Sequence, residues 1–437
     1  MTTTALGPWP APVARGPVVA SVSVPGSKSA TNRALVLAAL ADGTSTIRKP
    51  LRSRDTNLMA DAVRVLGAEV VDSGENWTVR GSVVGHATGA VAIDLGNAGT
   101  VARFVPPLAA LVSGTVAFDG DARMRERPVG PLLDALRTLG VEVDDGGRGA
   151  FPLTITGRGA VRGGVVTLDA SSSSQLVSGL LLAGACFTGG VTVRHDGPPV
   201  PSMPHVRMTV QMLRERGVQV DDTADDVWAV TPGAVGSGDT AIEPDLSSAA
   251  PFLAAAAVTA GSVTVADWPA VTTQAGDEFP RLLARMGCTV DTGPQGLRLH
   301  GPSRLGGLEA DLHDVGELTP VLAAVCAVAN GPSRLTGVAH LRRHETDRLA
   351  ALAREIGNLG GAVRELPDGL EISPRPLHGG QFATYNDHRL AMAAAVLGLV
   401  VPGVAVENVE TTAKTLPGFP DRWLALLGEA TATDGNG

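Results

Sequence analysis

The sequence is short of aromatic residues, cysteines and basic residues. One Tyr, five Trp and eight Phe among 437 residues leave few side chains on which unstacked bases could stack. The three cysteines, Cys186, Cys288 and Cys326, lie in or beside apolar stretches without metal-ligand spacing, so we expect buried free thiols in a reducing, cytoplasmic setting. Because 44 Asp and Glu outnumber 35 Lys and Arg, the net charge of -9 disfavours nucleic acid or an anionic membrane as the main partner.

Long apolar runs are also missing. The stretch from Ala170 to Val193 is interrupted by Ser and Gly, and the stretch from Leu390 to Val406 contains Pro402 and Gly403, so neither is expected to span a bilayer. The segment from Met1 to Pro17 has no basic start followed by an apolar core, and we expect no signal peptide. The length suits two or three globular domains that each bury a core.

One pattern occurs five times along the chain. It consists of an amphipathic helix ending in Gly, a short strand, a polar turn and a second strand, which is typical of a helix packed on a hairpin. The glycines at the helix ends are spaced by 70 to 77 residues. They are Gly67, Gly140, Gly217, Gly287 and Gly360.

Further helices and strands between these copies, such as Ser173 to Cys186, make each unit a βαβαββ-like module, and six modules would fill the length. We expect the sixth to combine Pro420 to Leu427 with N-terminal strands around Val18 to Val24. This closure predicts one domain of residues 1–24 and 243–437, with residues 25–242 inserted as the other domain. Two crossovers near Val24 and Glu243 would form the hinge.

Three polar segments precede apolar helices and expose small donors where a helix dipole attracts anions. They are Pro25 to Arg33 (PGSKSATNR), Leu95 to Arg103 (LGNAGTVAR) and Ala170 to Gln175 (ASSSSQ). Basic residues gather in such loops although the protein is acidic overall, which favours a small, multiply anionic ligand. These basic residues are Lys28, Arg33, Arg127, Arg343, Arg348, Arg389 and Lys414.

Each polar residue also has a purely structural interpretation. Gly-Ser-Lys before a helix is an ordinary N-cap, and an N-terminal Glu such as Glu317 often only compensates a helix dipole. Arg103 and Asp347 could form structural ion pairs, and Glu345 could anchor a salt bridge. His388 could be a packing histidine.

Taken together and in this order, the motifs resemble those of the EPSP synthase family from Val24 to Phe419. They are PGSK-S-x-x-NRAL, LGNAGT-x-x-R, ERP, SSSQ, HETDRL, YNDHR-x-AM and AKT-x-P. The resemblance implies an α/β fold, a two-domain inside-out α/β barrel with three βαβαββ repeats per domain and a two-strand hinge. It also implies neither metal nor organic cofactor, and the small-molecule substrates phosphoenolpyruvate and shikimate 3-phosphate. We expect a monomer, although the sequence itself does not reveal the oligomeric state.

The same resemblance implies a role for each matching residue. Those expected to bind shikimate 3-phosphate are Lys28, Ser29, Arg33, Ser173, Ser174, Gln175, Ser202, Glu317, His340 and His344. Those expected to bind phosphoenolpyruvate are Lys28, Asn97, Gly99, Arg127, Gln175, Arg348, Arg389 and Lys414. Glu317 would take the proton of the substrate 5-hydroxyl and Glu345 would protonate the methylene, with Lys28 as a further candidate; a tetrahedral intermediate would then eliminate phosphate.

The chain departs from the commonest family pattern at four positions. Glu317 stands where Asp is usual, His340 where Asn is usual, His344 where Lys is usual and His205 where Tyr is common. A neutral imidazole cannot replace a permanent ammonium. We therefore hypothesise that a ligand anion raises the pKa of His344 and that substrate affinity weakens as pH rises through it.

Two alternatives stay open at this point. The sister family transfers enolpyruvyl to UDP-N-acetylglucosamine, but it usually carries a reactive Cys in the loop matching Arg123 to Pro128 and Asn in place of Ser29. A non-catalytic phosphate-ligand or RNA-end-binding protein is the other, although both carboxylates are retained. Gly99 is small enough to permit binding of glyphosate, the inhibitor that competes with phosphoenolpyruvate in the EPSP synthase family. The sequence leaves open whether this protein is sensitive to glyphosate.

Overall fold

The protein is described by a computed structural model that covers residues 7–432, so the expectation for Met1 to Pro17 lies partly outside the described residues. The chain divides into two compact units. The inserted unit is Gly26–Glu243, and the terminal unit is Met1–Pro25 with Pro244–Gly437. In the inserted unit the amide of Ser27 donates to Glu243 O (2.8 Å), and in the terminal unit the amide of Asp245 donates to Pro25 O (2.9 Å). The two segments that connect the units are thus hydrogen-bonded to each other, once inside the inserted unit and once inside the terminal unit.

Five four-stranded sheets share one topology. The first strand is parallel to the second, the fourth lies antiparallel beside the second, and the third is antiparallel at the edge. A helix connects the first two strands and another connects the second to the third, which is the βαβαββ module expected from the sequence. Chain order is altered in one sheet, where the first strand, β14, follows β3, β4 and β5 in the chain. In another sheet the inserted unit separates the first strand, β2, from the second, β15.

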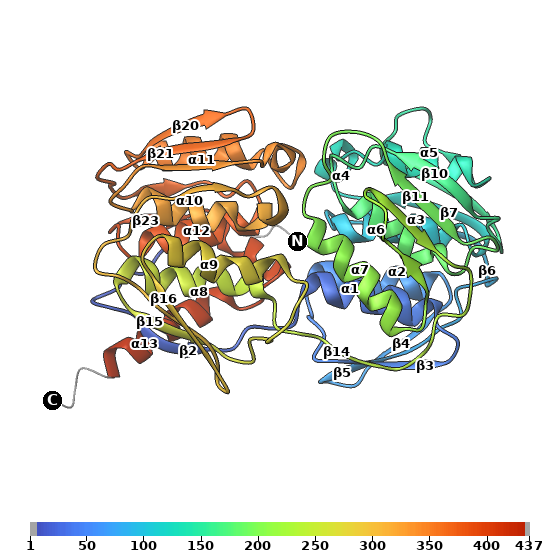
Figure 1. The fold of residues 1–437 in the computed structure, drawn as a ribbon, viewed down its shortest axis with the longest axis horizontal. Helices are drawn as coiled ribbons and strands as arrows, with labels where there is room; N and C mark the ends of the chain where they lie inside the picture. Colours follow the sequence, from blue (N-terminus) through green and yellow to red (C-terminus); the bar gives the residue numbers. More distant parts are fainter. Residues whose placement is uncertain (1–6, 433–437) are drawn as a thin grey trace. The chain divides into compact units, whose positions relative to one another are not determined.

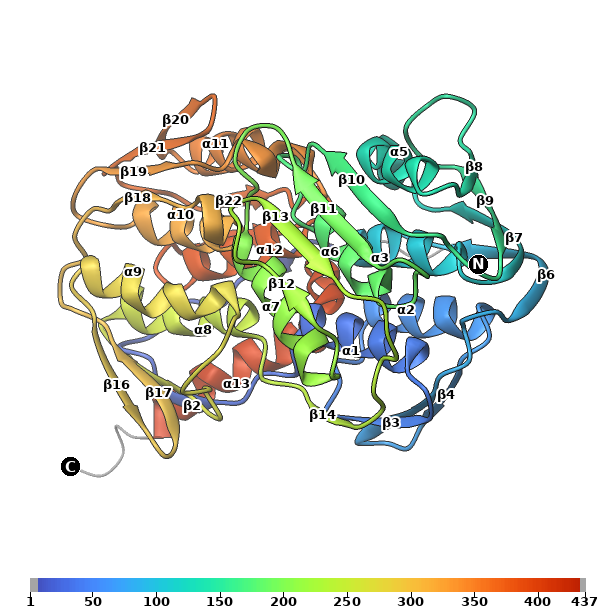
Figure 2. The same ribbon diagram turned by 45° about the vertical axis from the view of Figure 1, so that its right-hand side comes forward.

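The inserted unit contains three modules around three interior helices. The interior helices are α1 (Lys28–Leu40), α3 (Gly99–Ala109) and α6 (Gln175–Gly184), and the outer ones are α2 (Arg54–Val65), α4 (Ala122–Glu126), α5 (Gly130–Thr138) and α7 (Met203–Glu215). The sheets are β14 (Asp239–Ala241), β3 (Thr44–Arg48), β5 (Asn76–Arg80), β4 (Glu69–Asp72); β6 (Ala87–Asp94), β7 (Ser113–Asp119), β9 (Leu153–Arg158), β8 (Glu142–Asp144); and β10 (Gly164–Leu168), β11 (Val191–His195), β13 (Val227–Val230), β12 (Val220–Asp221). Figure 2 shows α1 and α3 between the sheet of β3 and β14 and that of β10 and β11.

The terminal unit repeats this plan. Its interior helices are α8 (Leu246–Thr259), α10 (Thr319–Ala327) and α12 (His388–Gly398), and its outer helices are α9 (Phe279–Arg285), α11 (Arg348–Asn358) and α13 (Phe419–Ala432). The sheets are β2 (Val19–Val22), β15 (Ser262–Val265), β17 (Gly296–His300), β16 (Thr289–Gly293); β18 (Glu309–Asp311), β19 (Ser333–Thr336), β21 (Gly369–Ser373), β20 (Ala362–Leu366); and β22 (Gly380–Phe382), β23 (Val404–Val406), β1 (Trp9–Pro10). Four 3-10 segments are η1 (Ala275–Glu278), η2 (His313–Leu318), η3 (Ala339–Arg343) and η4 (Val409–Lys414). In Figure 1, the sheet with β20 and β21 lies above α10, and the sheet with β15 and β16 lies below α8.

The interior helices of the terminal unit are buried because their sequences are almost entirely apolar beyond the first three residues. Every residue of α10 and α12 is buried, and α8 contains six Ala among its 14 residues, with buried Phe252 and Leu253. A helix without a polar face must be enclosed, and small Ala side chains let three such helices pack closely. The α/β class and the interior position of the helices confirm the fold expected from the resemblance.

The repeated glycines end five outer helices with the same cap. Gly67, Gly140, Gly217, Gly287 and Gly360 all have positive φ, between 78° and 108°. After α2, for example, the amide of Gly67 donates to Arg64 O and the amide of Ala68 to Val63 O. This is the helix C-cap that favours Gly, because a Cβ is strained in the left-handed region.

The expectation that Val18 to Val24 completes the sixth module is wrong. Val19–Val22 is β2, which pairs in parallel with Ser262–Val265 (β15) and serves as the first strand of that sheet. The sixth sheet is completed by Trp9–Pro10 (β1), antiparallel to Val404–Val406 (β23). The chain leaves the terminal unit after β2 and returns at α8, so β2, α8 and β15 together form an ordinary parallel crossover.

Candidate active site

The three interior helices of the inserted unit begin close together. On α1, Asn32 Nδ2 donates to Thr100 Oγ1 at the start of α3 (2.6 Å). A β-carbon placed on Gly99, the first residue of α3, would lie 3.2 Å from Gln175 Oε1 at the start of α6. The free N–H groups and dipoles of three helices therefore favour negative charge at one place.

Arg127 lies against this same place. It follows α4 and is 6% exposed, and its Nη1 donates to the carbonyl oxygen (3.2 Å) and Oδ1 (3.1 Å) of Asn97. Its Nε and Gln175 Oε1 are buried without a hydrogen-bond partner among the described residues. A β-carbon on Gly99 would lie 2.6 Å from Arg127 Nη2. Unmet polar groups beside a glycine leave both the room and the need for a polar ligand.

Lys28 is the first residue of α1 and is paired with an acid that sequence reasoning missed. Its Nζ lies 3.6 Å from Oδ2 of Asp55, which is buried in the first turn of α2. The pair fixes where the ammonium group lies. Asp55 gave no signal in the sequence because an acidic residue in a first helical turn is ordinary dipole compensation.

Arg33 is the most buried cation of this group, at 1% exposure. Its guanidinium donates to Thr209 Oγ1 (2.7 Å), Ser178 Oγ (3.3 Å) and the carbonyl oxygens of Ser29 (3.1 Å) and His205 (2.9 Å). Burial lowers its pKa to about 9. Arg33 thus joins α1 to α6 and α7 and has no carboxylate partner among residues 7–432.

The predicted serines lie in turns at helix starts. Ser173 Oγ accepts from the amide of Gln175 (3.2 Å), and buried Ser174 directly precedes α6. Ser202 has φ of 56° and precedes α7 without capping it through its side chain. Ser29 lies in the first turn of α1. Their hydroxyl groups are the small donors that an anion at a helix N-terminus uses.

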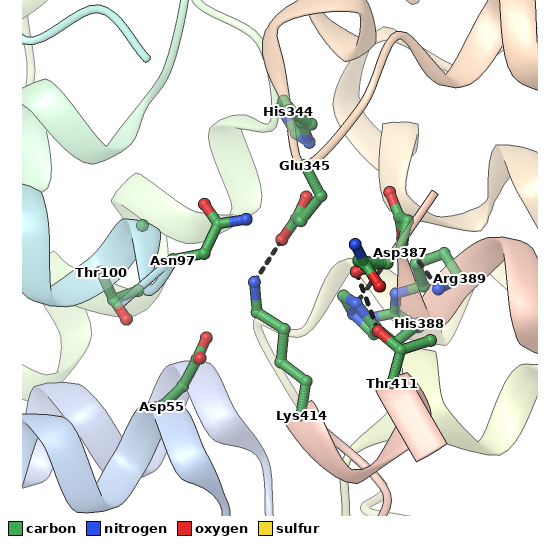
Figure 3. Close-up of polar contacts among 12 residues, drawn as sticks. Asp55, Asn97, Thr100, His344, Glu345, Asp387, His388, Arg389, Thr411 and Lys414 are labelled. Carbon is green, nitrogen blue, oxygen red and sulfur yellow. Dashed lines mark hydrogen bonds and ion pairs between the residues drawn. The ribbon is translucent and has the colours of Figure 1, made fainter. Parts of the chain in front are cut away.

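The terminal unit gathers a second set of charges, shown in Figure 3. Arg348, the first residue of α11, donates through Nε to Asp387 Oδ2 (2.7 Å) and through Nη2 to Asp387 Oδ1 (3.1 Å) and Glu345 Oε2 (3.1 Å). Lys414 Nζ donates to Glu345 Oε1 (2.7 Å). Burial lowers the pKa of Arg348, but the charges of Asp387 and Glu345 outweigh that effect and raise it above its ordinary value.

Arg389 belongs to the start of α12 and has no acidic partner among the described residues. It is 6% exposed, and it donates to the carbonyl oxygen (2.7 Å) and Oγ (2.9 Å) of Ser247 at the start of α8. Asp387 caps α12 by accepting from the amide of Arg389 (2.9 Å). The starts of two interior helices are therefore adjacent here, as in the inserted unit.

Three imidazoles form a cluster beside these charges. The ring of His340 lies 6.1 Å from that of His313 and 5.7 Å from that of His344, measured between centroids. Burial, helped by the charges of His313 and Arg348 and opposed by that of Glu317, lowers the pKa of His340 to about 4, so it is neutral at pH 7. Its Nε2 is buried without a hydrogen-bond partner in the described chain.

His344 contacts Arg348, and Glu317 lies within reach of the same charges. Arg348 Nη1 is 3.3 Å from His344 Nδ1, and because a guanidinium only donates, Nδ1 accepts and the ring carries its proton on Nε2. This contact holds a neutral ring; the hypothesis of a charged His344 concerns the ligand-bound enzyme and stays a prediction. Glu317 lies in η2, partly buried, directly before α10.

The structure brings the predicted residues together within each unit. Asn97, Gly99, Arg127 and Gln175 converge in the inserted unit, and His344, Glu345, Arg348 and Lys414 form one network in the terminal unit. Sequence reasoning missed Asp387 as a functional residue. Asp387 lies in the motif Tyr385 to Arg389, whose unbroken polarity was its only signal.

Several other expectations concern groups outside these clusters. Burial raises the pKa of Cys186 to about 11 and those of Cys288 and Cys326 to about 12, so none is a thiolate at neutral pH. All three thiols are free. Residues 7–432 contain no group of three or more His, Cys, Asp and Glu side chains arranged for a metal ion. Within the same range, no helix has the length and apolar character needed to cross a membrane.

Interior helices that begin beside buried guanidinium and ammonium groups define, in both units, an α/β enzyme that acts on small, multiply anionic substrates. A model of the family EPSP synthase (3-phosphoshikimate 1-carboxyvinyltransferase) matches residues 13–423. A 3-phosphoshikimate 1-carboxyvinyltransferase from Kocuria rhizophila is 54% identical over 431 residues, which is 96% of each chain. The chain therefore belongs to the EPSP synthase family.

Solved structures agree. An EPSP synthase structure from Acinetobacter baumannii has a TM-score of 0.77 and 25% identity, covering 95% of this chain and 97% of that one. A second EPSP synthase structure from the same organism has a TM-score of 0.75 and 25% identity, with coverage of 94% and 96%. The chain is a transferase of the shikimate pathway that moves the enolpyruvyl group of phosphoenolpyruvate to the 5-hydroxyl of shikimate 3-phosphate. This decides against UDP-N-acetylglucosamine as acceptor and against a non-catalytic binding protein.

Proposed function

We propose that both charge clusters contribute residues to the binding of each substrate of this reaction, as the family resemblance implies. For phosphoenolpyruvate the residues are Lys28, Asn97, Gly99, Arg127, Gln175, Arg348, Arg389 and Lys414. For shikimate 3-phosphate they are Lys28, Ser29, Arg33, Ser173, Ser174, Gln175, Ser202, Glu317, His340 and His344. Both substrates carry a carboxylate and a phosphate group, so each needs several donors at once.

The observation that carries this proposal is the state of Arg127 and Arg389. Each is 6% exposed, and each is bonded to amide, hydroxyl or carbonyl oxygens without any carboxylate among the described residues. A buried guanidinium without a counter-charge is costly unless an anion arrives. A substrate carboxylate or phosphate supplies that anion.

Proton transfer is assigned to the two glutamates. Glu317 takes the proton of the 5-hydroxyl as it attacks, and Glu345 gives a proton to the methylene carbon, with Lys28 as the alternative donor. Phosphate then leaves from a tetrahedral intermediate while the methyl group gives up a proton, which restores the carbon–carbon double bond. Cations on the departing phosphate and on the carboxylate stabilise the charges that develop.

The contacts of Glu345 constrain this assignment. Both of its oxygens accept from cations, Lys414 at 2.7 Å and Arg348 at 3.1 Å, so the resting group is a carboxylate and must gain a proton before it can donate one. An anionic substrate that takes over a hydrogen bond from Lys414 removes one of these cations and favours the protonated form. Substrate binding would thereby prepare Glu345 as an acid.

The departures from the commonest pattern are assigned to the acceptor substrate. His344 stands near Arg348, and its Nε2–H is assigned as a donor to the shikimate 3-phosphate anion. His340, which is neutral, offers a ring nitrogen for a hydrogen bond rather than a charge. Glu317 has one more methylene than the usual Asp and keeps the carboxylate.

The decisive experiment compares two arginines of one segment. Arg127→Lys is expected to raise the KM for phosphoenolpyruvate by about ten- to a hundredfold, because hydrogen bonds to charged groups contribute ~1.5–3 kcal/mol. The matched control is Arg125→Lys, since exposed Arg125 forms its ion pair with Asp119 (2.7 Å) at the surface. Phosphate release with shikimate 3-phosphate, and separately with UDP-N-acetylglucosamine, is the assay. Equal KM values in both variants would contradict the assignment of Arg127.

Finer properties are also proposed. We expect a monomer in the cytoplasm that has neither nucleic acid nor membrane as a partner, since the chain is acidic overall. Glyphosate is expected to compete with phosphoenolpyruvate beside Gly99. Sedimentation of the purified enzyme and inhibition kinetics test these two expectations.

A further inference from the structure

A strained turn precedes the motif residues Asp387 to Arg389. The amide of Asp387 donates to Thr384 O (2.8 Å), which closes a β-turn whose central residues Tyr385 and Asn386 have φ of 53° and 57°. Turns with two positive φ values favour Asn and Gly, and a bulky Tyr is strained there. The surrounding structure must hold such a turn in place.

Glu355 holds Tyr385. This glutamate, 3% exposed in α11, accepts from the Tyr385 hydroxyl through Oε1 (2.6 Å) and from the amide of Ala383 through Oε2 (3.0 Å). Burial and the charge of Glu355 raise the pKa of Tyr385, so the phenol keeps the proton that it donates. Both oxygens of this buried carboxylate thus accept hydrogen bonds from the turn and the residues just before it.

Two residues near η4 hold Asn386. Asn408 Nδ2 donates to Asn386 Oδ1 (2.7 Å), and Thr411 Oγ1 donates to Asn386 O (2.8 Å). Asn408 is itself left-handed, with φ of 45°. It starts the 3-10 segment that ends at Lys414.

The turn therefore connects the three cations proposed to bind phosphoenolpyruvate. The residue after the turn, Asp387, accepts a hydrogen bond from Arg348 Nε (2.7 Å) and caps α12 by accepting from the amide of Arg389. Through Asn408 and Thr411 it also contacts the segment that ends at Lys414. Helix α11 contacts the loop twice, through Arg348 and, two turns later, through Glu355.

We propose that Glu355 and Asn408 are positioning residues for the transfer reaction, which clamp the left-handed turn Tyr385–Asn386 and thereby place Arg348, Arg389 and Lys414. Neither residue is among those assigned to bind substrate. The inference rests on the proposed assignment of these cations to phosphoenolpyruvate. It predicts that loosening the clamp weakens phosphoenolpyruvate binding more than shikimate 3-phosphate binding.

Steady-state kinetics with each substrate varied tests the clamp. Glu355→Gln, Tyr385→Phe and Asn408→Gly are each expected to raise the KM for phosphoenolpyruvate about tenfold, the equivalent of ~1.4 kcal/mol, with a smaller change in the other KM. Arg354→Gln is the control, because Arg354 contacts the Tyr385 hydroxyl only weakly (3.4 Å) and from an exposed position. A variant with a lower melting temperature but an unchanged KM for phosphoenolpyruvate would show a merely structural residue and overturn the proposal.

A pair of substitutions at Asn386 separates turn conformation from the lost side-chain contact. Asn386→Gly and Asn386→Ala both remove the bond to Asn408, but only Gly adopts positive φ without strain. The Ala variant should show a KM for phosphoenolpyruvate at least about fivefold above that of the Gly variant. Equal KM values would refute the role of the turn.

Arg389→Lys distinguishes a failure of the positioning role from a failure of the cation assignment. If it raises the KM while Glu355→Gln and Tyr385→Phe do not, the cation assignment stands and the positioning role fails. If Arg389→Lys leaves the KM unchanged, the assignment itself fails. Should Glu355→Gln not fold, Tyr385→Phe, which removes a single hydroxyl group, decides.

Discussion

His340 should make the stability of the enzyme depend on pH, and replacing it should remove that dependence. The imidazole is 8% exposed, and its Nε2 has no partner among the described residues. His313 and Arg348 lie close enough to disfavour a positive charge on the His340 ring. The test variant is His340→Asn, which introduces the residue usual in the family and removes the titrating group.

The magnitude follows from the pKa. Burial, together with His313 and Arg348, lowers the pKa of His340 from 6.5 to about 4. Between these values the unfolded chain binds a proton that the native chain does not, so the free energy of unfolding falls as the pH falls. At ~1.36 kcal/mol per pH unit, the loss reaches about 2 kcal/mol at pH 5 and ~3 kcal/mol at pH 4, and it is absent above pH 6.5.

Urea unfolding at pH 7.5, 6 and 5 measures this loss. The native enzyme should lose about 2 kcal/mol more than His340→Asn between the two extremes. His300→Asn is the control, because His300 is partly exposed, paired with Asp291 at 3.1 Å, and such surface pairs contribute little. Parallel stability curves for the native enzyme and His340→Asn would refute the reasoning.

Three further predictions test the site. The affinity for shikimate 3-phosphate should weaken as pH rises from about 5.5 to 8 in the native enzyme and not in His344→Gln, as expected for a titrating imidazole; an identical binding profile would contradict a charged His344. Gly99→Ala should raise the KM for phosphoenolpyruvate about tenfold or more, since its β-carbon would lie 2.6 Å from Arg127 Nη2; an unchanged KM would mean that Arg127 moves freely. Gly316→Ala should destabilise by about 1–3 kcal/mol, because its β-carbon would lie 2.5 Å from His340 Nε2, and less in the His340→Asn background; an additive double-mutant cycle would exclude this contact.

The repeat in the sequence predicted the fold class because its cause is local. A Gly that ends a helix in the left-handed region is required by the backbone alone, and all five repeated glycines adopt it. The closure of the sixth sheet has no such signal. Trp9–Pro10 is only two residues long, and pairing it with Val404–Val406 depends on contacts almost 400 residues apart in the chain.

The site was predictable where it consists of helix starts. Lys28, Gly99, Gln175, Arg348 and His388 each begin a helix in the structure. The motifs place small hydrogen-bond donors before an apolar run. This pattern predicts a helix start, where the helix dipole favours an anionic ligand. Their partners were not predictable, because the pairing of Arg348 with Asp387 or of Lys28 with Asp55 depends on how distant segments pack.

Arg123, Arg125 and Arg127 show most clearly what packing adds to the sequence. They alternate within five residues and are chemically identical, yet Arg123 pairs with Glu126 and Arg125 with Asp119 at the surface. Helix α4 ends at Glu126, so Arg127 has extended backbone with φ of -77° and ψ of 128°, and its side chain turns to Asn97. Burial without a carboxylate partner, rather than residue type, therefore distinguishes the arginine proposed to bind a ligand from the arginines that form ion pairs at the surface.

A second criterion, the number of residues to which the guanidinium already donates, separates Arg389 from Arg33. Among the residues that the structure describes, the Arg389 side chain donates only to Ser247, whereas Arg33 donates to four different residues. Buried Arg216 resembles Arg33 in this respect, since it donates to two hydroxyl and two carbonyl groups that join α7 to the neighbouring sheet. Arg33 can therefore hold helices together whether or not a substrate is bound, and its substitution should lower stability as well as affinity, while that of Arg389 should chiefly lower affinity.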